Sequence, residues 1–346
     1  MQTSALETLM TIGRPAPLGF LLITIIACHN CTSDDAPAVC AVDEIVLAAA
    51  DSAMHPEGIA ATSDGTLYVS GFLDRSIVRV TPCGDGPERF VAAGALGNVA
   101  GLLVDEAEGV LWACHSDFGQ MPPNPRVSRI DLASGKILAT HAFPAGSGIC
   151  NDLTRDGAGH LYLTDSFANR IVRIAADDLA RDGELTDTAT MWSADSAFGT
   201  LAPMTFGLNG IAWAGGSDLY VVAYHGNAPA TQGDPLLPSQ LYRVPMQADG
   251  SAGAAVVVGT IPFGDGLEHL DGTRFLVNEQ SSTVSILDLA DGGVRLTPVA
   301  SGLDFSTTSA LVGDAFWVVE GQLDHFLDPS LGPATEPFRL RRFDLP

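Results

Sequence analysis

Four polar side chains stand at the start of apolar, strand-like segments, where polar residues are uncommon. They are Glu57 in "PEGIA", Asn151 in "CNDL", Asn209 in "LNGIAW" and Asp265 in "GDGL". Asn and Asp are depleted in strands, and a polar group buried there needs a partner. Two carboxylates and two amides brought together would repel and stay unsatisfied unless a cation lay among them. Such an all-oxygen set favours Ca²⁺ over zinc or copper, with another divalent ion as the alternative.

An internal repeat explains how these four residues could meet. Six segments share one pattern: an apolar strand, a turn often built on Asp-Gly, and a strand rich in aromatic and β-branched residues. Their equivalent positions are Gly58, Gly101, Asp152, Gly210, Gly266 and Ser309, spaced by 43, 51, 58, 56 and 43 residues. We read Gly and Asp here as residues of tight turns with positive φ. Taken singly, each of the four polar residues could be a turn cap, but their matching positions favour one shared site.

The repeats also predict the fold. Further strand-like runs such as "SIVRVTP" and "RIVRIA" follow each pair of strands, and helical periodicity is nearly absent, with at most one turn in "ADDLARDG". Four strands in a unit of this length are typical of β-propeller blades. The last unit ends one strand short at "FRLRRFDLP", while "DEIVLAA" precedes the first unit without a blade of its own. We therefore predict an all-β, six-bladed β-propeller over residues 41–346, in which the N-terminal strand closes the last blade.

The charge of the chain excludes one class of partner. The 346 residues include 41 acidic and 17 basic side chains, for a formal net charge of −24, and Lys136 is the only lysine. Such a surface repels phosphate backbones, so we expect no nucleic-acid partner. We read the charge as a source of solubility and expect a small-molecule substrate, while the oligomeric state stays open.

Residues 1–28 predict export. The apolar run 18–27, "LGFLLITIIA", follows Arg14, is short for a membrane span and suits the core of a signal peptide. Its end, "IIAC", resembles a bacterial lipoprotein cleavage box, in which Cys28 becomes the lipidated first residue; an ordinary cleaved signal is the alternative. Residues 29–40 read as a flexible tether. We expect an exported protein, either in a bacterial periplasm or anchored to a membrane through Cys28, with the cell surface as a further location.

Five cysteines follow Cys28, an odd number, and an oxidising compartment would pair some of them. We predict a disulfide between Cys40 and Cys83, because both flank strands near the start of the fold. Cys150 adjoins Asn151, but neighbouring side chains of a strand point in opposite directions, so we do not expect it to be a ligand.

The four polar motifs together resemble the metal-binding motifs of the senescence marker protein/gluconolactonase family of six-bladed propellers, which is related to diisopropyl-fluorophosphatase and the paraoxonase-like hydrolases. The resemblance covers nearly all of residues 53–346. It implies that Glu57, Asn209 and Asp265 bind a divalent ion in the central channel. It also implies that Asn151 either joins them or orients the substrate.

Two positions depart from these relatives. A His-Gly pair of the paraoxonase-like proteins is replaced here by Ala100 and Gly101, and the His that follows a Glu in the last fluorophosphatase-like blade is replaced by Gly321 after Glu320. Both departures count against phosphotriesterase activity, whereas hydrolysis of lactones or esters is less affected.

The resemblance implies a calcium-dependent hydrolase of lactones or esters, in which the cation polarises the carbonyl and activates a water. Asp265 is the candidate general base or nucleophile. Because a bound cation would depress the pKa of Asp265, a second group could assist, and the candidates are His115, His225 and Glu320.

Two other functions stay open. A non-catalytic, ligand-binding propeller with a structural ion is one of them. A lyase or synthase like the strictosidine synthases is disfavoured, because their catalytic Glu has no counterpart here. The long loops are Pro-rich and partly apolar, which indicates a partly enclosed ligand of low charge.

Overall fold

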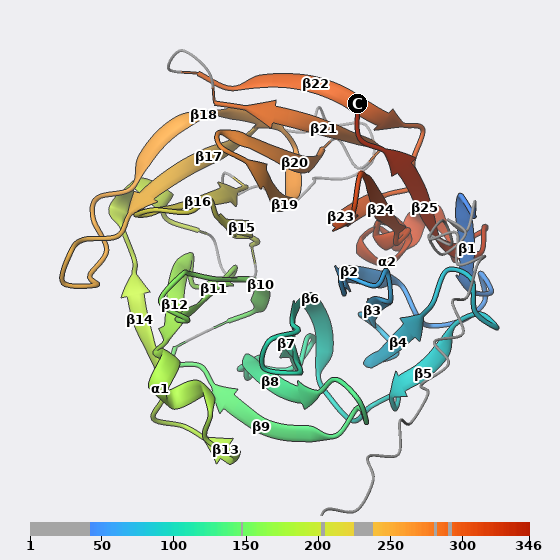
Figure 1. The fold of residues 1–346 in the computed structure, drawn as a ribbon, viewed down its shortest axis with the longest axis horizontal. Coiled ribbons are helices and arrows are strands. Elements are labelled where there is room, and N and C mark those ends of the chain that lie inside the picture. The colour runs from blue at the N-terminus through green and yellow to red at the C-terminus, as the bar shows by residue number, and fades with distance from the viewer. Residues whose placement is uncertain (1–41, 147, 202–204, 225–237, 280–281, 290–292) are drawn as a thin grey trace, which may run out of the picture. The chain divides into compact units, whose positions relative to one another are not determined.

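A computed structural model describes residues 42–346 except 147, 202–204, 225–237, 280–281 and 290–292. Six β-sheets surround a central channel, and one edge strand of each sheet, here called its inner strand, lies nearest to it (Figure 1). The predicted six-bladed, all-β propeller is therefore confirmed. Residues 1–41, with the predicted signal peptide, the tether and Cys28, lie outside the described residues, so those assignments stay predictions.

Each blade is a meander of antiparallel strands that runs outward from the channel. Blade 1 consists of β2 (Pro56–Ala61), β3 (Leu67–Gly71), β4 (Ser76–Val80) and β5 (Glu88–Val91). Blade 2 consists of β6 (Asn98–Asp105), β7 (Val110–Ser116), β8 (Arg126–Asp131) and β9 (Ile137–Ala142), and β13 (Gly183–Leu185) adds a fifth strand parallel to β9. Blade 3 consists of β10 (Cys150–Arg155), β11 (Leu161–Asp165), β12 (Arg170–Ile174) and β14 (Ala189–Ser193).

The second half of the ring repeats this order. Blade 4 consists of β15 (Leu208–Trp213), β16 (Asp218–Ala223), β17 (Pro238–Pro245) and β18 (Val256–Pro262). Blade 5 consists of β19 (Gly264–Asp271), β20 (Arg274–Glu279), β21 (Thr283–Asp288) and β22 (Arg295–Ser301). Blade 6 consists of β23 (Ser306–Val312), β24 (Ala315–Glu320), β25 (Phe338–Asp344) and β1 (Glu44–Ala48).

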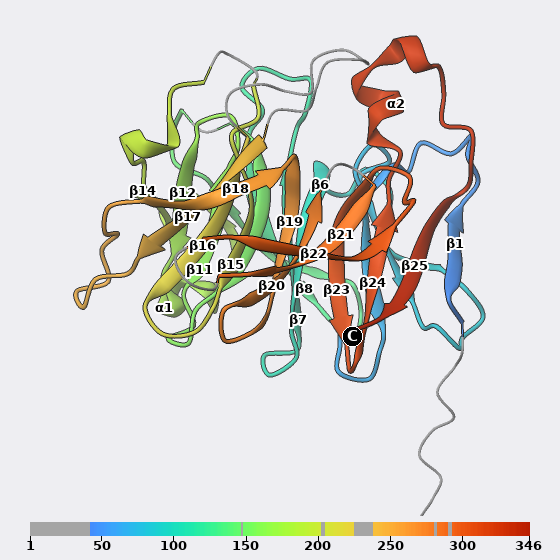
Figure 2. The ribbon, with the colours of Figure 1, turned by 90° about the horizontal axis from the view of Figure 1, so that it is seen from above.

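Among the described residues, helices are few and short. They are α1 (Ala176–Leu179), η1 (Ser196–Phe198), α2 (Leu323–Leu327) and η2 (Pro329–Leu331). The single turn expected in "ADDLARDG" is α1. In the side view, α2 stands at the face where the second strands end and the first strands begin (Figure 2). No helix in the described part of the chain is long and apolar enough to cross a membrane.

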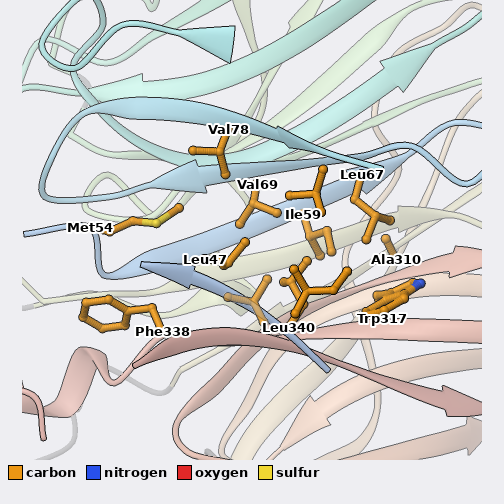
Figure 3. Close-up of a cluster of buried hydrophobic side chains, with 13 residues drawn as sticks. Leu47, Met54, Ile59, Leu67, Val69, Val78, Ala310, Trp317, Phe338 and Leu340 are labelled. Atoms are coloured by element: carbon orange, nitrogen blue, oxygen red, sulfur yellow. The ribbon is translucent and has the colours of Figure 1, made fainter. Parts of the chain in front are cut away.

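The N-terminal strand closes the ring, as the sequence predicts. β1 pairs with β25 in antiparallel register, with Ile45 opposite Leu340. Leu47, Phe338 and Leu340 then pack against blade 1 in one cluster of buried side chains (Figure 3). Burial of apolar surface contributes about 25 cal/mol per Å². The joint between the first and last blades is therefore held by a continuous hydrophobic core as well as by strand pairing.

Every inner strand carries a β-bulge at the same place. In blade 1 the register moves from Pro56 opposite Gly71 to Ile59 opposite Val69, so that Glu57 and Gly58 share one partner position. The same two-residue step occurs in the five other inner strands. Its first residues are, in blade order, Glu57, Ala100, Asn151, Asn209, Asp265 and Thr307. A bulge re-aims side chains locally, and the equivalent residues of blades 1 to 5 lie together at one mouth of the channel.

The repeat glycines have a different role from the one the sequence suggests. Gly58, Gly101, Gly210 and Gly266 are the second bulge residues, inside inner strands, and none of them has a positive φ. A Cβ at each would overlap a backbone carbonyl of the next inner strand, for example that of Ala100 beside Gly58. Their function is close approach of neighbouring strands, so the tight-turn reading is wrong.

The two remaining repeat positions break the glycine pattern. In blade 3, Asp152 is the second bulge residue, and its Oδ2 accepts the backbone N–H of Ile211 in blade 4 at 2.9 Å. In blade 6 the second bulge residue is Thr308, because the register moves from Ser306 to Ser309. The repeat pattern predicts Ser309 at this position, which is one residue too far along.

A disulfide that the sequence did not indicate links blades 2 and 3. Cys114 on β7 is bonded to Cys150 on β10, with a Cα–Cα distance of 5.3 Å. Cys150 directly precedes Asn151, so the bond fixes the start of the bulge that presents Asn151. Cys83 is disulfide-bonded, while Cys40 lies outside the described residues, and their pairing stays a prediction.

Candidate metal centre and substrate cavity

The structure brings the four predicted polar residues together. Glu57, Asn151, Asn209 and Asp265 all line one cavity at the channel mouth, whose empty space, open solvent included, is about 620 Å³. They come from β2, β10, β15 and β19, and each is the first residue of its bulge. Glu57 is 8% exposed, Asn151 7% and Asn209 4%, so their polar groups are largely removed from bulk water.

Burial and neighbouring negative charge disfavour the ionised form of both carboxyl groups at the mouth. Burial raises the pKa of Glu57 well above its usual value, and the charges of Asp265 and Asp152 raise it further. Burial and the charge of Asp152 raise the pKa of Asp265 to about 7, although hydrogen bonds from Asn209 and Tyr224 act in the opposite direction. A cation among these groups would reverse this penalty, because it favours the charged form of each carboxyl.

One unsatisfied atom supports a cation at this place. Glu57 Oε2 is buried and has no hydrogen-bond partner in the described structure, and an unpaired buried oxygen is costly. The amides of Asn151 and Asn209 offer further oxygens, which hard divalent cations accept. Within the described ranges, no group of three or more His, Cys, Asp or Glu residues could hold a metal. The candidate set consists of two carboxylates and two amides, whose oxygens are donors of the kind that hard divalent cations accept.

Two more carboxyl groups, those of Asp152 and Glu268, lie around the channel, and the sequence motifs do not place either of them in the site. Burial is the main reason that the pKa of Asp152 is raised to about 7. Desolvation by the surrounding protein and the charge of Asp152 raise the pKa of Glu268 to about 8. Glu268 nevertheless retains solvent-accessible surface. Asp152 could have been noticed as the one charged residue in the glycine series.

Aromatic side chains form the walls above the polar floor. Six of the fifteen phenylalanines line the cavity: Phe72, Phe118, Phe206, Phe263, Phe305 and Phe326. The ring of Phe118 lies 5.7 Å from Phe72, 5.8 Å from Phe326 and 6.3 Å from Phe206, and Tyr224 stacks on Phe263 at 4.9 Å. None of these residues belongs to the motifs that predict the site. The available signal was an aromatic residue beside the mouth end of strands in several blades.

His115 does not reach the cavity. It is 2% exposed; its Nδ1 accepts the N–H of Gly97 at 3.1 Å, and its Nε2 lies 2.9 Å from Ser128 Oγ. Burial, together with the positive charge of Arg126, lowers the pKa of His115 to about 3. Both ring nitrogens are engaged within blade 2, so the structure gives His115 a packing role and no access to a substrate in this cavity.

Glu320 is likewise engaged elsewhere. Its Oε1 accepts the N–H of Asp304 at 3.0 Å, and its carboxylate lies 3.2 Å from Arg339 and 3.5 Å from Arg341. It is not among the residues that line the cavity. His225 lies outside the described residues. Among the described candidates for a base, Asp265 is the one that lines the cavity.

The fold resembles solved propellers of several functions, although no protein-family model and no curated protein sequence matches this chain. A gluconolactonase from Xanthomonas campestris is 19% identical, with a TM-score of 0.53 over 88% of this chain and 89% of that one. The calcium-binding protein regucalcin from Agrobacterium tumefaciens is 15% identical, with a TM-score of 0.53 over 87% and 96%. An aldose sugar dehydrogenase from Streptomyces coelicolor, bound to PQQ, is 16% identical, with a TM-score of 0.58 over 86% and 96%.

These similarities show the fold. The likeness to gluconolactonases that the motifs indicated is present at this level. A dehydrogenase on the same architecture means that the activity must be argued from the site itself.

Proposed function

We propose that this protein is a hydrolase of lactones or esters that depends on a divalent cation, with Ca²⁺ as the cation. The observation that carries the proposal is the convergence of Glu57, Asn151, Asn209 and Asp265 on one cavity, with a buried, unpartnered oxygen on Glu57. Two of the structurally similar proteins are a gluconolactonase and a calcium-binding protein by name.

The residues of the site have distinct roles in this proposal. Glu57, Asn151, Asn209 and Asp265 would hold the cation, which supplies carbonyl polarisation and activation of water when bound. Asp265 accepts a proton from the attacking water. Tyr224 holds the Asp265 carboxylate by a hydrogen bond. Because burial and the nearby charges of Asp265 and Glu57 raise the pKa of the Tyr224 phenol well above its usual value, Tyr224 keeps its proton and remains a donor.

Lactone hydrolysis followed by a pH indicator tests the proposal. We expect turnover of δ-valerolactone in 1 mM CaCl₂, loss of turnover in a chelator and recovery when Ca²⁺ is restored. Glu57→Gln and Asp265→Asn should each lower kcat/KM by about 100-fold or more, the scale of a lost electrostatic or acid–base contribution. Asp218→Asn on β16, in a loose surface ion pair with Arg243 at 3.7 Å, is the control. Turnover that survives both the chelator and the two substitutions would contradict the proposal.

A non-catalytic binding propeller is the second candidate. It is favoured by one observation: His115 and Glu320, the described candidates for a second base, are engaged away from the cavity. A protein that binds Ca²⁺ through Glu57 and Asp265 but opens no lactone or ester would support this alternative.

We also propose export through residues 1–28, with Cys28 as a lipidated N-terminus. The sequence pattern supports this part by itself. Mass spectrometry of the protein purified from membranes of a bacterial host should find a diacylated Cys28 peptide. An unmodified chain that begins before residue 28 would contradict it.

A further inference from the structure

We propose that the cavity selects uncharged lactones or esters that carry a bulky apolar group, and that it discriminates against polyhydroxylated lactones. This inference rests on the proposed hydrolase function and specifies the substrate class of the same site.

The distribution of polar groups in the cavity is the first argument. Ten of the fifteen lining residues are apolar, and the five polar ones are the four bulge residues and Tyr224. Glu57, Asn209 and Asp265 are proposed ligands of the cation. Asp265 is also hydrogen-bonded to Asn209 and to Tyr224. No Arg, Lys, Ser, Thr or Gln lines the cavity within the described part of the chain. The hydroxyls of a polyhydroxylated substrate would therefore meet aromatic walls.

The state of the aromatic walls is the second argument. Phe118, Phe206, Phe305 and Phe326 are each only partly buried, and Leu327 at the end of α2 is 42% exposed. These side chains surround a concave opening on a chain whose net charge is −24. Clustered apolar surface of this kind on an otherwise charged protein marks a binding site. The acidic charge also disfavours anionic ligands.

Backbone strain at the rim is the third argument. Phe263 has φ 42° and Phe305 has φ 52°, a region that bulky side chains rarely adopt. Each residue directly precedes an inner strand, β19 or β23, and each lines the cavity. Strained residues persist where the surrounding structure fixes them, and they cluster at functional sites. The chain therefore retains two phenyl rings at the mouth in a conformation that Gly or Asn would adopt more readily.

Selectivity follows from these contacts. Each buried methylene of a substrate side chain is worth about fourfold in binding, whereas each hydroxyl buried without a partner costs about tenfold. We therefore expect kcat/KM for δ-decanolactone, which has a pentyl side chain, to exceed that for δ-valerolactone by about tenfold or more. Glucono-δ-lactone, corrected for its spontaneous opening, should be at least about 100-fold poorer than δ-decanolactone.

Variants of the wall test the cause of this preference. Phe118→Ala and Phe326→Ala should each reduce the ratio of kcat/KM for δ-decanolactone over δ-valerolactone by about fivefold or more, because they remove apolar contact with the side chain. Phe90→Ala is the matched control. Phe90 stands on β5, the outermost strand of blade 1, packs on Tyr68 at 4.9 Å and does not line the cavity. It should leave the ratio unchanged.

A binding measurement separates failure of this inference from failure of the proposed function. The neutral dye N-phenyl-1-naphthylamine should fluoresce on binding, lose affinity in Phe118→Ala, and be displaced by δ-decanolactone but not by glucono-δ-lactone. If no lactone is hydrolysed and this displacement occurs, the proposed hydrolysis fails and the apolar site stands. If glucono-δ-lactone is hydrolysed as well as δ-decanolactone, or if the dye does not bind, the selectivity inference is overturned.

Discussion

Replacing Asp265 by Asn should stabilise the protein when no cation is bound, although it removes a residue of the proposed site. Burial and the charge of Asp152 raise the pKa of Asp265 from 3.8 to about 7. A carboxyl with a raised pKa destabilises the native state in its ionised form, so its cost is absent at low pH and grows as the pH rises from about 4 to 7. Three pKa units correspond to about 4 kcal/mol, and water at the channel mouth reduces this to an expected ~2 kcal/mol.

Urea unfolding in a chelator measures this effect. At pH 8 the free energy of unfolding of Asp265→Asn should exceed that of the wild type by about 2 kcal/mol, and the difference should disappear near pH 4. In 10 mM CaCl₂ the order should reverse, because a ligand of the native state stabilises only the chain that binds it. Asp218→Asn should follow the wild type in both conditions. An Asp265→Asn protein that is no more stable than the wild type in chelator at pH 8 would refute the conclusion that the native structure disfavours the ionised form of Asp265.

Three further predictions concern the scaffold. Burial lowers the pKa of His115 from 6.5 to about 3, so its stabilising contribution is complete above about pH 6.5 and declines below it. Between pH 7.5 and 4.5, the free energy of unfolding in urea should fall by about 2 kcal/mol more for the wild type than for His115→Gln. Equal losses in the two proteins would contradict this. Gly58→Ala should cost at least about 2 kcal/mol, because its Cβ would overlap the carbonyl of Ala100; an unchanged melting temperature would show that the strands can separate. The double variant Cys114→Ala, Cys150→Ala opens a loop with a sequence separation of 36 and should lose about 3–4 kcal/mol in chemical unfolding, whereas a loss under 1 kcal/mol would mean that strand packing alone fixes this joint.

The fold could be predicted from the sequence because the sequence contains an internal repeat. Six copies of an apolar strand, a turn and an aromatic strand fix the number of blades, and the mismatch between "DEIVLAA" and "FRLRRFDLP" indicates how the ring closes. Glu57, Asn151, Asn209 and Asp265 could be found because they occupy one position of the repeat. That position is the first residue of a β-bulge.

Other features depend on contacts between blades that a repeat does not encode. The repeat glycines were read as turn residues, because the overlap of Gly58 with Ala100 exists only once neighbouring inner strands are packed. His115 is an ordinary candidate base by type and position, and only its bonds to Gly97 and Ser128 show that it is buried within a blade. The aromatic walls come from α2 and from loop residues beside the ends of strands, and only the assembled ring shows that these residues meet above one cavity.

A calcium titration by isothermal calorimetry tests the central claim most directly. We predict that residues 41–346 bind one Ca²⁺ per chain and that Glu57→Gln and Asp265→Asn each abolish the signal, while Asp218→Asn binds as the wild type does. Absence of binding to the wild type, or equal binding by all four proteins, would contradict a cation site at the channel mouth.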